Sequence, residues 1–301
     1  MEKQLNEYLP EFLARLNTKR RWHLYVDGMR LKVDFRCVSV EVDPSLKKLI
    51  PIFLLTGWGS GWEGILPLAF SLACRGYKVI LVSLPGYGDS QNPPPRYWQE
   101  NLLGHHAGIV LAVLRRLAIR KAYFIGHSMG AQVLAEAARI CPEACEKLLL
   151  LHPSGIEKVG FFGKIALLWR FVASGVRLRR EYHASPESSH NQLQELIDFC
   201  GRQKSPWWGK RKLRRAEFQE ICRGGLLKTL QEVASPIIFL SGGRDTVYPA
   251  WESFHLIYQA IPEKKIAWNI LPGNHHNPTL FHSKTTAEAI DNLLNDERNE
   301  S

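Results

Sequence analysis

Residues 122–138 read AYFIGHSMGAQVLAEAA, and this stretch decides the fold. The apolar and β-branched run Ala122–Ile125 is typical of a buried strand. The run Ala131–Ala138 holds helix-forming residues and neither glycine nor proline, so it predicts a helix. Between them, Gly126-His127-Ser128-Met129-Gly130 has a glycine on each side of a serine, as a sharp strand-to-helix turn requires. Such a turn holds a hydroxyl group at its tip, with a helix amino terminus behind it. Ser128 is therefore a candidate nucleophile.

Strands and helices alternate on both sides of this turn. A hairpin signal stands at Asp27-Gly28, where a turn-forming pair separates two runs with strand character. Further strands are expected at 50–55, 78–83, 147–151, 236–241 and 265–271, after hairpin strands at 22–26 and 29–42. Helices are expected at 62–75, 97–117, 249–261 and 283–295. This order implies the α/β class, with a mostly parallel central sheet that helices cover on both faces.

The pattern changes after Ser154. Residues 156–232 show helical periodicity without a clear strand. We therefore expect one core formed by residues 1–155 and 233–301, with a helical insertion at 156–232. Apolar residues at helical spacing within residues 1–20 predict an amphipathic amino-terminal helix. This helix is expected to pack against the core or against a second copy of the chain in a homodimer.

Composition places the chain among ordinary globular proteins. It has 301 residues, of which 45% are hydrophobic and 23% are charged. Its first residues lack the pattern of a secretory signal, and Lys164 and Arg170 interrupt the longest apolar stretch, 159–176. The six cysteines form neither a CxxC pair nor a metal-ligand spacing. We expect a reduced, cytoplasmic protein without a transmembrane segment and without a metal site.

Positive charge is concentrated in the insertion. Residues 156–235 hold fifteen Lys or Arg and eight Asp or Glu, a net charge of +7 within a total of +10. A basic run, Lys204–Arg215, surrounds Trp207-Trp208. A solvated surface is the simplest interpretation of this run, and steering of an anionic substrate or peripheral contact with an anionic membrane are alternatives. Nucleic-acid binding is not expected, because no recognition motif accompanies the charge.

Two further segments carry candidates for serine chemistry, which needs a base, an orienting acid and donors for an oxyanion. Asp245 follows the strand at 236–241 through a glycine turn, Ser241-Gly242-Gly243-Arg244. The next strand is followed by Pro272-Gly273-Asn274 and then by two histidines, His275 and His276. The order serine, aspartate, histidine is one of the known orders of a catalytic triad. Glu157 is a distant rival of Asp245, and either histidine is a candidate base.

Five landmarks along nearly the whole chain resemble those of the α/β-hydrolase family. They are the serine turn, Gly242-x-x-Asp245, Pro272-Gly273-x-x-His276, and the loops Leu54–Gly59 (LLTGWG) and Leu84–Ser90 (LPGYGDS). The resemblance implies that the backbone amides of Trp58 and Met129 form the oxyanion hole and that Gly57 and Trp58 adjoin the substrate. It favours His276 over His275 as the base. It also implies that the insertion at 156–232 is a cap, or lid, over the site, and that no metal or organic cofactor takes part.

The function expected from these residues is hydrolysis of a small or medium carboxylic ester through an acyl-enzyme, with Ser128, Asp245 and His276 as the triad. A serine hydrolase of the esterase or lipase kind is thus the first hypothesis. Two alternatives remain open at this point. One is hydrolysis of a carbon–carbon bond in an acidic diketone-like substrate, which the basic insertion would suit. The other is a ligand-binding module of the same fold with little turnover.

Overall fold

The computed structural model describes the whole chain except residues 1, 18–19, 185–210, 265, 277–281 and 297–301. The first half of the basic run, including Trp207 and Trp208, therefore lies outside the described residues.

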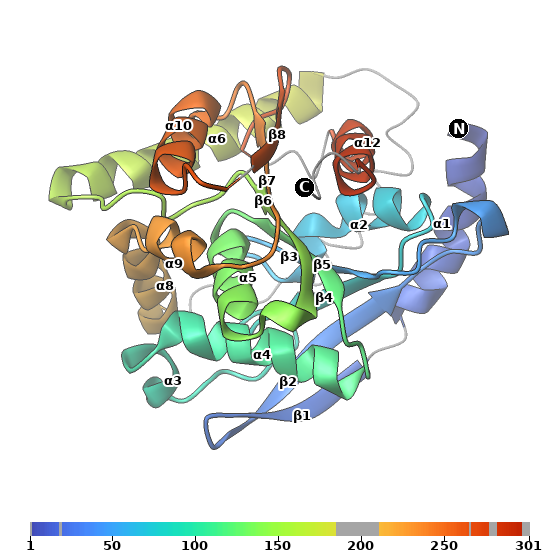
Figure 1. Cartoon of the computed structure of the whole chain (residues 1–301), viewed down its shortest axis with the longest axis horizontal. Coiled ribbons are helices and arrows are strands. Elements are labelled where there is room, and N and C mark those ends of the chain that lie inside the picture. Colours follow the sequence, from blue (N-terminus) through green and yellow to red (C-terminus); the bar gives the residue numbers. More distant parts are fainter. Residues whose placement is uncertain (1, 18–19, 185–210, 265, 277–281, 297–301) are drawn as a thin grey trace.

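An eight-stranded sheet forms the centre of the molecule (Figure 1). Its strands lie in the order β1-β2-β4-β3-β5-β6-β7-β8. The pairs β1–β2 and β2–β4 are antiparallel, and all the other neighbouring pairs are parallel, so the sheet is mostly parallel as the sequence predicts. The bounds are β1 (Arg20–Val26), β2 (Met29–Val38), β3 (Ile52–Leu55), β4 (Val79–Ser83), β5 (Ala122–His127), β6 (Cys145–Leu151), β7 (Ile237–Gly242) and β8 (Ile266–Leu271).

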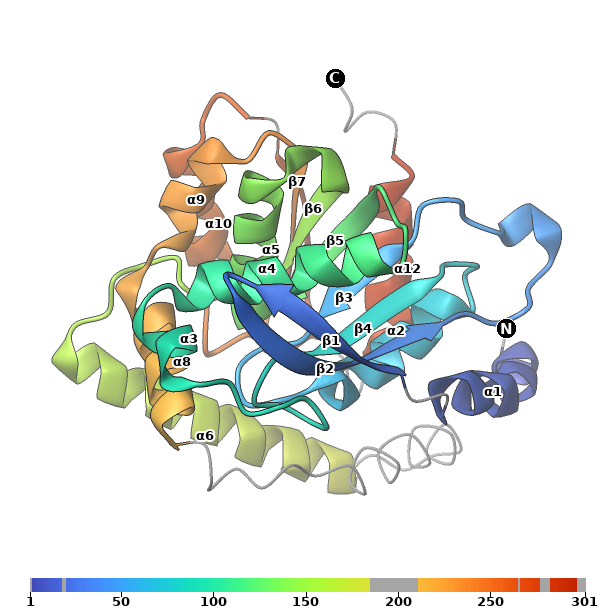
Figure 2. The ribbon, with the colours of Figure 1, turned by 90° about the horizontal axis from the view of Figure 1, so that it is seen from below.

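Helices cover both faces of this sheet (Figures 1 and 2). Strand β3 shows why its sequence is apolar throughout: Phe53 and Leu55 face one core, Ile52 and Leu54 face the other, and all four are fully buried. Alternate side chains of a strand point to opposite faces, so a central strand between two helix layers has no polar side. One face carries α4 (Leu102–Arg116), α5 (Met129–Ile140), α9 (Leu226–Glu232) and α10 (Ala250–Ala260), and the other carries α1 (Glu2–Asn17), α2 (Leu66–Ala73) and α12 (Ser283–Leu294).

Two expected helices differ from the structure. The single helix expected at 97–117 is wrong: α3 (Pro95–Gln99) ends before α4 begins at Leu102. Asn101 causes the break, because its side chain accepts a hydrogen bond from the amide of Gly104 and so caps α4. The helix expected at 62–75 begins as a 3-10 turn at Trp62–Ile65 before it continues as α2. The apolar periodicity runs across both junctions, so it does not reveal them.

The regular elements described between β6 and β7 are all helices. It contains α6 (Phe161–Ala184), α8 (Arg211–Arg223) and α9. The long helix α6 runs along the outside of the molecule (Figure 2). A hydrogen bond from the amide of Val159 to the carbonyl of Cys222 joins the approach to α6 with the end of α8. Among the described helices, none combines the length and apolar character that crossing a membrane requires.

Candidate active site

The turn between β5 and α5 places Ser128 in a strained conformation, with φ of +52° and ψ of −117°. Hydrogen bonds fix this backbone on both sides, because Ser128 donates to the carbonyl of Leu151 and accepts from the amide of Ser154. Close approach explains the flanking glycines. A Cβ atom on Gly126 would lie 2.5 Å from the backbone of Ala131, and one on Gly130 would lie 2.6 Å from the carbonyl oxygen of Leu55.

A chain of hydrogen bonds connects Ser128, His276 and Asp245. The Nε2 atom of His276 lies 3.3 Å from Ser128 Oγ, and its Nδ1 atom lies 2.9 Å from Asp245 Oδ2. The other carboxylate oxygen of Asp245 accepts hydrogen bonds from the amides of Val247 and Tyr248. All three members of this chain are buried. The parallel sheet brings them together, because the turns that follow β5, β7 and β8 all lie at the carboxyl edge.

The two adjacent histidines have different partners. His275 Nδ1 lies 3.1 Å from the carbonyl oxygen of Arg244, whereas His276 contacts both Ser128 and Asp245. The neighbouring Asn274 is held by a hydrogen bond from its amide group to Thr286 in α12. The structure therefore places His276, and not His275, between the serine and the aspartate.

A third histidine, His152, binds the same carboxylate and was missed by the sequence analysis. It follows β6 directly with φ of +47°, and its Nδ1 atom lies 2.9 Å from Asp245 Oδ2, the oxygen that also receives His276. Its Nε2 atom is buried and has no hydrogen-bond partner among the described residues. The only sequence signal was a histidine immediately after a strand, at the edge where the other site residues gather.

His152, Asp245 and His276 also form a group that could hold a metal ion, since their ligand atoms lie within 4.8 Å of one another. The fit to an ion is poor, however. Both Nδ1 atoms are hydrogen-bonded to the carboxylate that would be the third ligand, and all three side chains are buried. A metal would have to displace these hydrogen bonds, and we therefore treat the group as a hydrogen-bonded cluster.

Burial and hydrogen bonding shift the pKa of Asp245 in opposite directions. Burial by itself would raise the pKa of Asp245, but the charge of His276 and hydrogen bonds from His152 and His276 outweigh it and lower that pKa. Burial lowers the pKa of His152 despite the nearby carboxylate. Burial, with His276 and His152 close by, also lowers the pKa of His127 to about 3. Neutral His127 then donates from Nε2 to the carbonyl oxygen of His276, 2.7 Å away. Asp245 thus stays ionised beside a neutral His152.

The two residues expected to supply oxyanion amides lie on either side of Ser128. Met129 is the first residue of α5, so its amide is one of the free donors at a helix amino terminus. Trp58 lies in the loop after β3, next to Gly57. A Cβ atom on Gly57 would lie 2.8 Å from Ser128 Cβ, which shows how closely this loop approaches the serine.

Helix α8 also contacts the loop after β3 that contains Trp58. The indole Nε1 of Trp58 donates to the carbonyl of Arg214, and the amide of Gly59 donates to Tyr87 Oη. Tyr87 Oη in turn donates to the buried carboxylate of Glu217, 2.7 Å away, and Glu217 also pairs with Arg214. The guanidinium of Arg214 lies 3.4 Å from the centre of the Tyr87 ring. A buried network therefore connects α8 to the loop that contains Trp58.

Aromatic side chains cover the hydrogen-bonded cluster of Ser128, His276 and Asp245. The ring of Phe171, from α6, lies 5.6 Å from the His276 ring and 5.9 Å from Trp58. The ring of Tyr248 lies 5.5 Å from His276. Phe218, from α8, lies 5.4 Å from Trp58. Because these rings exclude water, Ser128 is only 3% exposed.

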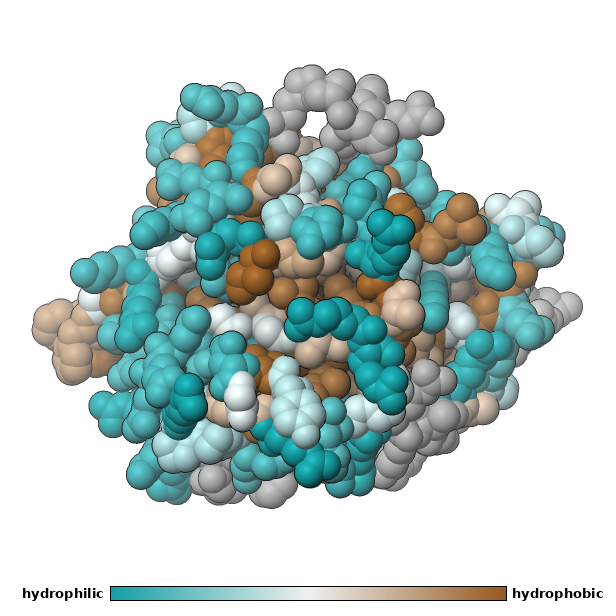
Figure 3. Space-filling model, turned by 60° about the horizontal axis from the view of Figure 1, so that its bottom comes forward, coloured by the Kyte–Doolittle hydropathy of each residue, from teal (hydrophilic) through white to brown (hydrophobic). Residues whose placement is uncertain are grey.

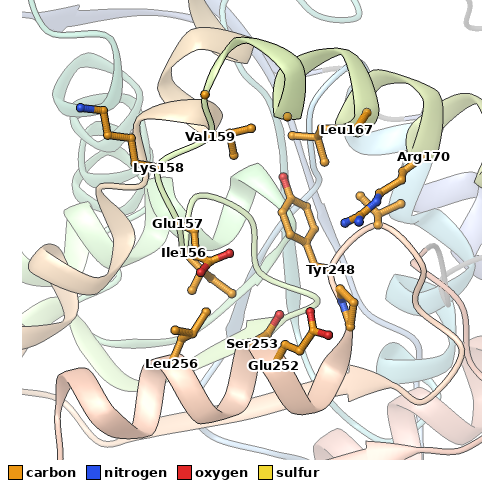
Figure 4. Close-up of a pocket in the computed structure, with 15 residues that line it drawn as sticks. Ile156, Glu157, Lys158, Val159, Leu167, Arg170, Tyr248, Glu252, Ser253 and Leu256 are labelled. Atoms are coloured by element: carbon orange, nitrogen blue, oxygen red, sulfur yellow. The ribbon is translucent and has the colours of Figure 1, made fainter.

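A cavity of about 310 Å³ lies beside this cover, between α6 and α10 (Figure 4). Tyr248 forms part of its wall and contacts His276 on its other side, whereas Ser128 and His276 do not line the cavity. Glu157, the rival acid in the sequence, lines this cavity, and it is Asp245 that binds His276. Lys158, Arg170 and Glu252 add further charges to the lining.

Comparisons with known proteins match this chain to hydrolases. The sequence model of the alpha/beta hydrolase fold matches residues 50–280. A putative esterase/lipase of Haemophilus influenzae is 28% identical over 123 residues, which span 41% of this chain and 40% of that protein. A pimeloyl-[acyl-carrier protein] methyl ester esterase of Methylococcus capsulatus is 26% identical over 256 residues, 81% of this chain and 94% of that protein.

Among solved structures, a thermophilic esterase from Thermogutta terrifontis matches with a TM-score of 0.65 and 19% identity, over 92% of this chain and 98% of that one. This likeness shows that the sheet and its helices are arranged in the same way. The strained serine turn, the order of the strands in the sheet and the sequence match over residues 50–280 all indicate the same family. The chain belongs to the α/β-hydrolase family.

Proposed function

We propose that this protein is a serine hydrolase that cleaves carboxylic esters, with Ser128 as nucleophile, His276 as base and Asp245 as the orienting acid. The hydrogen-bond chain from Ser128 Oγ through His276 to Asp245, at the tip of a strained turn, carries this proposal. The choice of an ester is supported by the methyl ester esterases, which match 81% of this chain, whereas 2-hydroxy-6-oxononadienedioate/2-hydroxy-6-oxononatrienedioate hydrolases match 33–47% of it.

The reaction follows from the positions of these groups. Ser128 Oγ attacks the ester carbonyl carbon while its proton passes to His276 Nε2, and Asp245 stabilises the imidazolium. The amides of Trp58 and Met129 donate to the oxyanion, and loss of one such donor costs roughly 3–4 kcal/mol. When the intermediate collapses, the alcohol leaves with the proton from His276. Water then gives a proton to His276 and attacks the acyl carbon, and the second collapse returns the proton to Ser128 and releases the acid.

The surroundings of Ser128 favour an ester with an apolar acyl or alkyl group. Trp58, Phe171, Phe218 and Tyr248 enclose the cluster, and Phe171 and Phe218 come from the insertion at 156–232. We propose that α6 and α8 of this insertion act as the cap. Since Phe171 lies against His276, we propose that α6 shifts when a substrate reaches the serine.

A fluorophosphonate probe and a series of p-nitrophenyl esters of increasing chain length test this function. The wild-type protein is expected to be labelled and to turn over esters, and Ser128→Ala to do neither while keeping the same melting temperature. The chain length with the highest kcat/KM measures the apolar space. A folded wild-type protein that is not labelled would contradict the proposal.

Two other outcomes separate the alternatives. A single burst of product without steady turnover would favour a binding module. Steady cleavage of an acidic vinylogous diketone, faster than cleavage of any ester in the series, would favour carbon–carbon bond hydrolysis.

A further inference from the structure

Helix α6 exposes apolar side chains that a helix on a globular protein normally buries. Seven large apolar residues of this helix are between 42% and 84% exposed, half of the fourteen such residues in the described part of the chain. At 100° per residue they fall within an arc of about 120°, so they form one continuous stripe. We call this set the outer stripe; its members are Phe161, Phe162, Ile165, Leu168, Trp169, Val172 and Val176.

The opposite side of α6 faces the catalytic cluster. Leu167 and Ser174 are buried, and Phe171 contacts the ring of His276. These three positions lie about 120° to 180° around the helix from the centre of the outer stripe. An amphipathic helix on a globular protein turns its apolar stripe toward the core. In α6 the outer stripe is wider than the apolar inner face, and it points away from the core. In Figure 3 the amino-terminal end of α6 is the tan projection at the left edge of the molecule.

Cations flank the outer stripe, and no anion does. Lys164 lies on one side of the stripe and Arg177 on the other, whereas Arg170 lines the cavity on the inner side of the helix. Between residues 161 and 177 the sequence contains no Asp or Glu. Apolar side chains bordered by long cationic ones are typical of helices that lie in the interface of an anionic membrane, where the cations reach the headgroups.

We propose that α6 docks on an anionic lipid surface through the outer stripe, and that the ester substrate of this protein reaches Ser128 from that surface. The second half of this inference rests on the proposed hydrolase function. The helix that would enter the lipid is the one whose inner face covers His276, so a movement of α6 at the surface would act directly on the cover. A second copy of the chain fits the stripe less well, because two facing stripes would bring their flanking cations together, and residues 161–177 contain no acidic residue to pair them.

Binding to vesicles tests the docking surface without relying on catalysis. The Ser128→Ala protein is incubated with vesicles of equal phosphatidylglycerol and phosphatidylcholine, or of phosphatidylcholine alone, and bound protein is measured by sedimentation. We expect binding to the anionic vesicles that weakens as salt is raised. The double variant Phe162→Ser/Trp169→Ser is expected to bind at least about tenfold more weakly, because two exposed aromatic groups are lost. The pair Lys164→Gln/Arg177→Gln is expected to lose about fivefold per cation.

Matched variants elsewhere serve as controls. Leu49→Ser/Trp251→Ser removes two apolar side chains that are 94% and 60% exposed, and Arg30→Gln/Arg120→Gln removes two exposed cations. Neither pair lies on α6, so both are expected to bind vesicles like the parent protein. Each set of substitutions is also made in a protein that keeps Ser128. The melting temperature of these proteins and their turnover of a short soluble ester show that each one is folded.

The outcomes distinguish this inference from the proposed function. The outer-stripe variant is Phe162→Ser/Trp169→Ser, and its control is Leu49→Ser/Trp251→Ser. If the two bind vesicles equally, or if the parent protein binds no vesicles, the docking surface is overturned even if short esters are hydrolysed. A wild-type dimer that the outer-stripe variant converts to a monomer, with no lipid binding, would assign the stripe to a second copy of the chain. Vesicle binding with no ester turnover would keep the docking surface and reject the hydrolase.

Discussion

At the scale of single residues, the unusual feature is an aspartate that serves two histidines. Asp245 Oδ2 receives both His276 Nδ1 and His152 Nδ1 at 2.9 Å, while Oδ1 is held by two backbone amides. Four donors on one buried carboxylate fix its position and keep it ionised. His152 therefore acts on the proposed triad through Asp245, as a positioning residue.

Replacing His152 tests this role. His152→Leu removes the donor, and we expect kcat for a short ester to fall about tenfold with little change in KM, because a hydrogen bond to a charged group is worth roughly 1.5–3 kcal/mol. His152→Asn keeps an N–H donor near the Nδ1 position and is expected to restore most of kcat. Equal kcat values in the two variants would show that His152 is only packed beside the site.

A buried neutral histidine also predicts how stability depends on pH. The pKa of His127 falls to about 3 in the folded protein, whereas an unfolded histidine titrates near pH 6.5. Between these values the unfolded chain binds one more proton than the folded one, so the free energy of unfolding decreases as pH falls. The expected slope from this group is about 1.4 kcal/mol per pH unit below about pH 6.

Urea unfolding from pH 7 to pH 4 measures this slope. In His127→Asn the contribution is absent, so the stability of the variant is expected to decrease less steeply than that of the wild type. An exposed histidine, His23, supplies the matched control, and the slope of His127→Asn is compared with that of His23→Asn. A steeper decline in His127→Asn would be incompatible with a neutral His127.

At the scale of elements, one of the links between α8 and the loop that carries Trp58 runs through the hydroxyl group of Tyr87. Tyr87 Oη accepts from the amide of Gly59 and donates to Glu217, which Arg214 neutralises. This path makes the position of the Trp58 amide, the proposed oxyanion donor, depend on a helix of the proposed cap. A fixed donor matters most in the transition state, where the negative charge develops.

Tyr87→Phe breaks this path while it keeps the ring under Arg214. We expect kcat to fall about tenfold with KM nearly unchanged, and the affinity for a trifluoromethyl ketone, whose adduct carries an oxyanion, to fall in parallel. Tyr77→Phe removes another hydroxyl group, which is bonded to Asp291 in α12 and not to this network, and is the matched control. A stability loss without a change in the affinity for the ketone would limit the network to a structural role.

At the scale of the whole molecule, α1 completes the second core. Leu9, Phe12 and Leu16 are buried within the single chain, and the Phe12 ring lies 5.0 Å from Phe70 in α2. The amino-terminal helix therefore packs against the body, one of the two positions that its sequence allowed. The homodimer stays a prediction, which sedimentation can test, and so does the cytoplasmic location.

Removing the buried ring of α1 measures this contribution. Phe12→Ala is expected to lower the free energy of unfolding by about 3–5 kcal/mol, because it leaves a cavity in the core. The neighbouring Leu13 is only half-buried, and Leu13→Ala is expected to cost about 1 kcal/mol. Urea titration of both variants checks the difference, and equal losses would show that α1 packs only loosely.

Local sequence determined the class of fold and the residues that converge on the serine. The apolar runs, the glycines around Ser128 and the turns before Asp245 and His276 are short-range patterns, and each has a direct physical cause in strand burial or backbone geometry. Where a local signal was overlooked, as at Asn101, the error was a helix boundary. Periodicity continues through such a boundary, while a single capping side chain ends the hydrogen-bond ladder.

Tertiary structure alone decided which distant side chains meet. His152 and Asp245 are 93 residues apart and Tyr87 and Glu217 are 130 apart, so no periodicity relates either pair. The tertiary structure also places His276, and not His275, against Asp245. Which of the two rings reaches the carboxylate depends on the path of the chain after β8. The same holds for α6. Its sequence shows an apolar stripe, but only packing shows that another face covers His276 and that the outer stripe is left to solvent.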